Sequence, residues 1–225
     1  MKDAPDAILR PEQAAYLERL LPPRDSLLAE MEERAAAEGI PVSDPEVGRL
    51  LGILARATKG RRVLEIGTAI GYGTLWLARS APGARVVTVD PDAARLEAAR
   101  GYLERAGVLE RVDLVQGEAL ELLPRLEGPW DLVYLDALKE EYRRCLDLVL
   151  PTVALGGVIV VDNLLWKGRA AVPPDEPDPA ADAIRSFNPY FLMHPQLAAQ
   201  ILPLGDGVGL AVKTGATIME RGGPF

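Results

Sequence analysis

Cysteine and histidine are almost absent from this chain of 225 residues. Cys145 is its single cysteine and His194 its single histidine. One cysteine excludes an internal disulfide and favours a reducing compartment, so we expect a cytoplasmic protein. Zinc sites usually draw on cysteine and histidine ligands, which this sequence does not provide as a cluster. We interpret Cys145, which falls in an expected helix, as a small buried hydrophobic residue.

Long apolar runs and an excess of basic residues are missing as well. No run reaches the roughly 18–20 residues that a membrane span needs. Residues 1–13 begin with two early acids, Asp3 and Asp6, and have no apolar stretch typical of a secretory signal. The net charge is −8, which disfavours a large nucleic-acid interface because an acidic surface repels phosphate. With 48% hydrophobic residues, the chain is expected to fold as a single domain over residues 1–225.

The first 58 residues are expected to be helical. Three segments with apolar residues at spacings of three and four span residues 11–21, 24–39 and 44–58. Gly39 is placed to end the second helix, and Ser43 or Asp44 to cap the third. We expect this helical segment to precede an α/β core over residues 61–213.

From residue 61 onward, expected strands alternate with expected helices. The strands are residues 61–67, 84–90, 111–117, 130–137 and 156–163, and the helices between them are residues 72–81, 91–107, 118–126 and 140–152. Nearly continuous apolar strands are typical of a parallel sheet with helices on both faces. A further helix at residues 179–192 and a hairpin turn at residues 205–207 follow. The pattern predicts an open, doubly wound sheet with an antiparallel strand near one edge and ligands at the carboxyl ends of its strands.

The first strand ends in a glycine-rich loop with the sequence EIGTAIGYG. Gly67, Gly71 and Gly73 allow the backbone to approach a ligand closely, although a plain strand-to-helix turn is the alternative. Their spacing differs from the G-x-G-x-x-G of dinucleotide-binding loops. Glu65 would repel a pyrophosphate there, whereas it suits a ligand with an ammonium or sulfonium charge. The loop therefore disfavours a nicotinamide cofactor.

The second and third strands end at residues suited to a nucleoside. Asp90 closes the second strand, and an acid about 20 residues beyond a glycine turn commonly accepts hydrogen bonds from a ribose diol. It could equally cap the next helix, with Pro91 as the first helical residue, and the two roles are compatible. After the third strand, Gly117 and Ala119 offer small side chains against which an adenine ring can lie.

The fourth strand ends on Asp136, and the fifth on Asp162 and Asn163. Adjacent strand ends lie about 5 Å apart, so the two carboxylates should repel each other unless a cation neutralises them. Three oxygen ligands suit Mg²⁺, Mn²⁺ or Ca²⁺, and helix capping is the alternative for each residue taken singly. Trp166 is either a flat wall for an aromatic substrate or a core residue that covers the sheet edge.

Several motifs occur in the order typical of one enzyme family. They are VLEIGTAIGYGTLWLA, TVDPD, GEALELLP, DLVYLDALKEEY, GGVIVVDNLLWKG, AIRSFN and LPLGDGVGLAVK. Together they resemble the metal-dependent O-methyltransferases of the caffeoyl-CoA type, to which catechol O-methyltransferase is more distantly related. The resemblance implies the Rossmann-like fold of class I S-adenosylmethionine-dependent methyltransferases, with a seven-stranded, mostly parallel sheet. It also implies a homodimer and a divalent metal, usually Mg²⁺.

The resemblance also assigns site residues by position. The implied cofactor contacts are Ser43, Glu65, Gly67, Thr68, Gly73, Asp90, Ala119 and Asp136. The implied metal ligands are Asp136, Asp162 and Asn163. Lys139 lies beside the reacting hydroxyl, so that Lys139 and Asp136 are the expected catalytic residues and Lys139 and Trp166 the expected substrate contacts. Gly73 stands where the family usually has serine, which removes one hydroxyl for the cofactor carboxylate, and Leu138 and Lys167 replace an aspartate and an asparagine.

The expected activity is methyl transfer from S-adenosylmethionine to one hydroxyl of a small vicinal dihydroxy, catechol-like aromatic acceptor. A divalent metal that chelates both hydroxyls would favour ionisation of a phenol, whose pKa is ordinarily ~10. Three alternatives stay open: a tRNA 5-hydroxyuridine O-methyltransferase, a nicotinamide-dependent oxidoreductase and a non-catalytic binding module. The acidic charge counts mildly against tRNA, and the intact set of metal ligands counts against a binding module.

Overall fold

The computed structural model describes residues 11–23, 25–59, 61–172 and 176–215. Seven strands form one sheet in the order β3-β2-β1-β4-β5-β7-β6. Their bounds are β1 Arg62–Ile66, β2 Arg85–Asp90, β3 Val112–Gln116, β4 Trp130–Leu135, β5 Val153–Val161, β6 Leu197–Leu202 and β7 Val208–Lys213. Strands β1 to β5 are mutually parallel, and β7 is antiparallel to both β5 and β6. The predicted mostly parallel sheet with an antiparallel strand near one edge is therefore confirmed.

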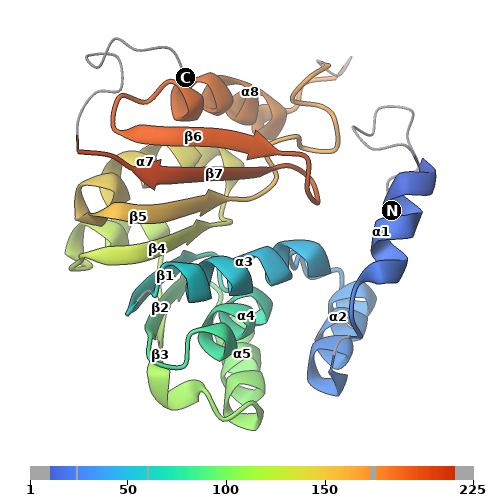
Figure 1. Ribbon diagram of the computed structural model, residues 1–225. Coiled ribbons are helices and arrows are strands. Elements are labelled where there is room, and N and C mark those ends of the chain that lie inside the picture. Colours follow the sequence, from blue (N-terminus) through green and yellow to red (C-terminus); the bar gives the residue numbers. More distant parts are fainter. Residues whose placement is uncertain (1–10, 24, 60, 173–175, 216–225) are drawn as a thin grey trace.

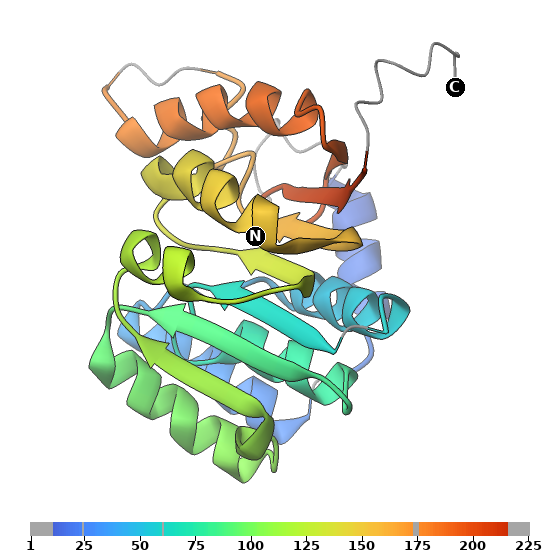
Figure 2. The same ribbon diagram turned by 90° about the vertical axis from the view of Figure 1, so that its left-hand side faces the viewer.

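Helices cover both faces of the sheet (Figure 2). Their bounds are α1 Pro11–Leu20, α2 Ser26–Glu38, α3 Pro45–Ala57, α4 Tyr72–Ser80, α5 Ala93–Arg105, α6 Ala119–Leu122, α7 Tyr142–Val149 and α8 Pro179–Leu192. Side chains of β4 alternate between the two halves of the core: Leu132 and Tyr134 pack on the side of α3, α4 and α5, and Val133 and Leu135 on the side of α7 and α8. In the part of the chain that is described, no helix is long and apolar enough to cross a membrane.

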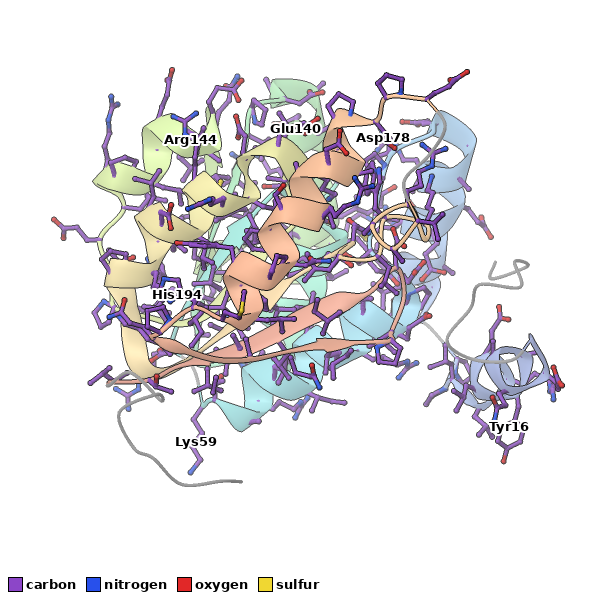
Figure 3. The ribbon with its side chains drawn as sticks, turned by 90° about the horizontal axis from the view of Figure 1, so that it is seen from above. Tyr16, Lys59, Glu140, Arg144, Asp178 and His194 are labelled. Atoms are coloured by element: carbon purple, nitrogen blue, oxygen red, sulfur yellow. The ribbon has the colours of Figure 1, made fainter. Side chains whose placement is uncertain are left out.

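Helix α1 stands away from the sheet, as Figures 1 and 3 show. Helix α2 packs on the core through residues such as Met31, which is fully buried. Helix α1 instead leaves Tyr16, Leu17 and Leu20 exposed by 55%, 50% and 58%. The predicted N-terminal helices are therefore present, but only two of the three pack against the α/β core.

Two expectations about element boundaries need correction. Strand β5 begins at Val153, earlier than the expected residue 156. Asp90 does not cap the following helix, because α5 begins at Ala93 and Asp92 accepts hydrogen bonds from two backbone N–H groups of its first turn. The carboxylate of Asp90 is therefore available to the glycine-rich loop.

The order of the strands reverses between β1 and β4: β2 and β3 lie beyond β1 on one side, and β5 lies beyond β4 on the other. The chain leaves β1 toward α4 on one face and leaves β4 toward α7 on the other. In open α/β sheets, ligands bind where such a reversal separates two strand ends. The loops that follow β1, β4 and β5 meet at this point, since the N–H of Asp136 donates to Ile66 and that of Asp162 donates to Leu135.

Candidate active site

The glycine-rich loop after β1 lies directly against the backbone at the end of β4. Gly67 has a φ of +102°, a conformation that residues with a Cβ rarely adopt. A Cβ built on Gly67 would lie 1.9 Å from the carbonyl oxygen of Asp136. The loop and the predicted metal ligand Asp136 are thus in contact only because residue 67 has no side chain.

We expect Gly67→Ala to destabilise the fold by about 3 kcal/mol or more, because strained φ and a backbone clash act together. Thermal unfolding of the purified variant measures the loss. Gly83→Ala is the matched control, since a Cβ at Gly83 meets no atom within 4 Å. Equal melting temperatures for Gly67→Ala and the wild type would contradict the close approach.

Asp90, the predicted ribose contact, also holds the glycine-rich loop in place. Its Oδ2 accepts hydrogen bonds from the backbone N–H groups of Thr68 at 3.1 Å and Ala69 at 2.8 Å, and its Oδ1 accepts from the N–H of Asp92 at 2.9 Å. Ala69 has a positive φ of 45°, a conformation that these bonds help to fix. One carboxylate thus joins the ends of β1 and β2.

Glu65 lies beneath the same loop and is only 1% exposed. Its Oε2 accepts hydrogen bonds from the hydroxyls of Thr74 and of Thr88, the latter at 2.6 Å. Burial raises the pKa of Glu65 to about 8, although the two threonine hydroxyls favour the ionised form. A buried acid whose hydrogen-bond partners here are two neutral hydroxyls suits a cationic ligand group nearby, which stays a prediction.

Two predicted metal ligands converge on one phenol oxygen. The hydroxyl of Tyr134 lies 2.8 Å from Oδ2 of Asp162 and 3.5 Å from Oδ2 of Asp136. Asp162 is 2% exposed, and burial followed by the charge of Asp136 raises its pKa. Neither aspartate caps a helix: Leu138 is the cap residue after β4, and a loop with Asn163 at a φ of 59° follows β5.

The donor set fits a hard divalent cation. Among the described residues, no group of three or more His, Cys, Asp or Glu is arranged to hold a metal ion. The predicted set has a different composition, with the carboxylates of Asp136 and Asp162 and the amide of Asn163. Carboxylate and amide oxygens are ligands of Mg²⁺, Mn²⁺ and Ca²⁺. A cation there would offset the loss of hydration and the repulsion from Asp136 that raise the pKa of Asp162.

Lys139 lies beside these carboxylates with its side chain only 10% exposed. Its Nζ donates hydrogen bonds to Oδ1 of Asp136 at 2.9 Å, to the carbonyl of Ala137 at 3.2 Å and to the hydroxyl of Tyr142 at 2.8 Å. Tyr142 in turn donates to the backbone carbonyl of Asp162 at 3.0 Å. The side-chain nitrogen of Lys139 is therefore held between the ends of β4 and β5.

Trp166 borders the site and is not a core residue. Its half-buried ring has its centroid 5.7 Å from Nζ of Lys139, and its Nε1 donates to Oδ2 of Asp178 at 3.2 Å. Asp178 caps the beginning of α8, where Figure 3 shows it. Leu138, on the loop after β4, is 63% exposed. The structure therefore does not support the interpretation of Trp166 as a core residue, and its role as a wall for an aromatic substrate stays a prediction.

The remaining predicted residues lie around these two groups. Ser43, before α3, is buried with its Oγ 2.7 Å from the Tyr134 hydroxyl. Thr68 belongs to the glycine-rich loop, and its hydroxyl lies 2.6 Å from that of Thr88. Ala119 begins α6 just after β3. Sequence reasoning missed Tyr134, although its position two residues before Asp136 places both side chains on one face of a strand.

The fold and its strand-end site define a class of protein, the Rossmann-like methyltransferases. Residues 23–214 match the O-methyltransferase family, and the chain belongs to that family.

Individual relatives agree with this assignment. Catechol O-methyltransferase of Mycobacterium tuberculosis is 39% identical over 213 residues, which cover 90% of this chain and 95% of the relative. Caffeoyl-CoA O-methyltransferase 1 of Eucalyptus globulus is 28% identical over 182 residues, which cover 76% and 74%. The crystal structure of the O-methyltransferase TomG from Streptomyces achromogenes, in complex with SAM, superposes with a TM-score of 0.80 at 33% identity and covers 91% of this chain and 96% of TomG.

Proposed function

We propose that this O-methyltransferase transfers the methyl group of S-adenosylmethionine to one hydroxyl of a small vicinal dihydroxy aromatic acceptor, with the help of a divalent metal. The observation that carries the proposal is the convergence of Asp136, Asp162 and Lys139 at the edge of the glycine-rich loop. The family assignment supports methyl transfer to oxygen, and the SAM bound to TomG supports the choice of methyl donor.

The residues after β1 and β2 would hold the methyl donor. Gly67 and Thr68 offer backbone close to the end of β4, and Asp90 offers carboxylate oxygens to a ribose diol. Glu65 beneath the loop supplies negative charge to an ammonium or sulfonium group, which would in turn favour the ionised carboxylate. Ala119 at the end of β3 offers a small side chain on the adenine side.

The residues after β4 and β5 would hold the metal and the acceptor. Asp136, Asp162 and Asn163 are the proposed ligands, and a bound divalent cation supplies Lewis-acid chemistry that lowers the pKa of a coordinated hydroxyl. Lys139 lies beside the same point and is the proposed group that assists proton removal. Its neutral amine would accept the proton of the acceptor hydroxyl, and the ammonium group so formed would stabilise the phenolate by its charge. Trp166 provides a flat wall for an aromatic ring, and the exposed Leu138 extends that apolar border.

The direct test is turnover with labelled S-adenosylmethionine and Mg²⁺. The acceptor panel contains catechols, the corresponding monophenols and tRNA that lacks the wobble-uridine methyl group. Label in catechols and not in monophenols supports the proposal, because only adjacent hydroxyls can chelate. Label in tRNA alone would overturn the small-molecule acceptor, and calorimetric binding of NAD in place of S-adenosylhomocysteine would overturn the cofactor.

We also propose that the chain forms a symmetric homodimer in which α1 is covered by a second copy. Tyr16, Leu17 and Leu20 form an exposed apolar face on a helix that stands off its own core, and such faces mark association sites. Light scattering at micromolar concentration should give the mass of a dimer, and Leu17→Asp should shift it toward the monomer. Glu18→Asp is the matched control on the same helix. A monomeric wild type would refute the dimer.

A further inference from the structure

The hydroxyl of Tyr134 lies between the two halves of the site, and neither the family assignment nor the motifs give it a role. The side chain is fully buried in β4, with 1% of its surface exposed. Its oxygen is 2.7 Å from Oγ of Ser43, a proposed cofactor contact, and 2.8 Å from Oδ2 of Asp162, a proposed metal ligand. One group therefore touches residues from both halves.

The chemistry of the three groups sets the direction of these hydrogen bonds. The ionised carboxylate of Asp162, which is the form that would bind a metal, can only accept, so Tyr134 donates its single proton to Asp162. The hydroxyl of Ser43 must then donate to the oxygen of Tyr134. The result is a chain of two hydrogen bonds. Ser43, before α3, donates to Tyr134 on β4, and Tyr134 donates to Asp162 at the end of β5.

Gly73 provides the room for this arrangement. A Cβ on Gly73 would lie 3.2 Å from Cε1 of Tyr134 and 2.5 Å from Oε1 of Glu65. Any side chain at position 73 would therefore crowd the ring or the buried carboxylate. Residue 73 is glycine where the family usually has serine. The missing side chain leaves the space that the ring of Tyr134 occupies.

We propose that Tyr134 is a positioning residue that couples cofactor binding to metal binding by fixing the orientations of Ser43 and Asp162. The inference rests on the proposed function, because it assigns Ser43 to the cofactor and Asp162 to the metal. Tyr134 contacts neither ligand in this account. It acts by limiting the rotation of two side chains that do, as partners behind metal ligands commonly do.

The test is Tyr134→Phe, which keeps the ring and removes the hydroxyl. Calorimetry measures the binding of Mn²⁺ and of S-adenosylhomocysteine, each alone and in the presence of the other. We expect Mn²⁺ to bind about 10- to 100-fold more weakly, and the mutual strengthening of the two ligands to disappear. The matched control is Tyr190→Phe, which also removes a hydrogen bond from a tyrosine to an aspartate, Asp147, but on α8 and away from the site.

Ser43→Ala keeps the inference testable if Tyr134→Phe does not fold. Ser43 is not a proposed metal ligand, so it can affect Mn²⁺ only through Tyr134, and we expect affinity for Mn²⁺ to fall about 5-fold or more. Wild-type affinity for Mn²⁺ in a folded Tyr134→Phe protein, or in Ser43→Ala where the former does not fold, would overturn the inference and leave the proposed function intact. A wild-type protein that binds neither ligand would overturn the proposed function itself.

Discussion

Asp162→Ala should remove most methyl transfer and leave the binding of S-adenosylhomocysteine nearly unchanged. The carboxylate is 2% exposed at the end of β5, on the acceptor side of the site, and it is the proposed ligand most fully removed from water. Loss of one oxygen ligand and of the charge it supplies should lower kcat on the order of 10³-fold, the scale of losing a preorganised electrostatic group. Steady-state turnover with Mg²⁺ and calorimetry with S-adenosylhomocysteine measure the two quantities.

Two comparisons make this result specific. Asp136→Ala should weaken both turnover and cofactor binding, because the backbone of Asp136 lies against Gly67 and its carboxylate accepts from Lys139. Asp113→Ala, which removes an exposed carboxylate on β3, should change neither. EDTA should abolish wild-type turnover and excess Mg²⁺ or Mn²⁺ should restore it. Full activity in EDTA, or equal rates on catechol and phenol, would overturn the metal-assisted mechanism.

The order of helices and strands could be predicted from the sequence because local signals agree with the fold. Strands β1 and β4 and the second half of β5 are buried on both faces, so their apolar composition distinguishes them from the amphipathic helices between them. Gly39, with a φ of 65°, ends α2 as expected. The acids at strand ends could also be found, since the carboxyl ends of parallel strands share one edge of a sheet.

Contacts between distant segments could not be predicted in the same way. The N–H groups that Asp90 holds lie 21 and 22 residues earlier in the chain, and Ser43 is 91 residues from Tyr134. Such pairs depend on how loops cross the sheet, which no local period encodes. The sequence does not single out Tyr134, because a tyrosine in an apolar strand is ordinarily a core residue, and its ring does lie in the core. Only the position of its hydroxyl distinguishes it.

Lys139→Ala should lower kcat by roughly 10²–10⁴-fold if the neutral amine of Lys139 accepts the acceptor proton, the usual scale for a positioned acid or base. Nζ is fixed by Asp136, Ala137 and Tyr142, so its position beside the carboxylates is set before any acceptor binds. Lys139→Arg keeps the charge but cannot accept a proton, because a guanidinium stays protonated in proteins. If Lys139→Arg remains as slow as Lys139→Ala, the role of Lys139 is to accept a proton. If Lys139→Arg has a kcat near that of the wild type, its role is to supply charge alone.

The acidity of the acceptor distinguishes proton removal from packing. A nitro group makes a catechol hydroxyl more acidic, so such an acceptor ionises without help from the enzyme, and the defect of Lys139→Ala should be much smaller on 4-nitrocatechol than on catechol. If Lys139 only fills space between Tyr142 and Trp166, whose rings lie 5.0 Å and 5.7 Å from Nζ, the two acceptors should show the same defect. Tyr142→Phe, which removes one partner of Nζ but keeps the ammonium group, should cost far less than Lys139→Ala on catechol. The ratio of the two defects thus measures how much of the rate depends on moving a proton at this one nitrogen.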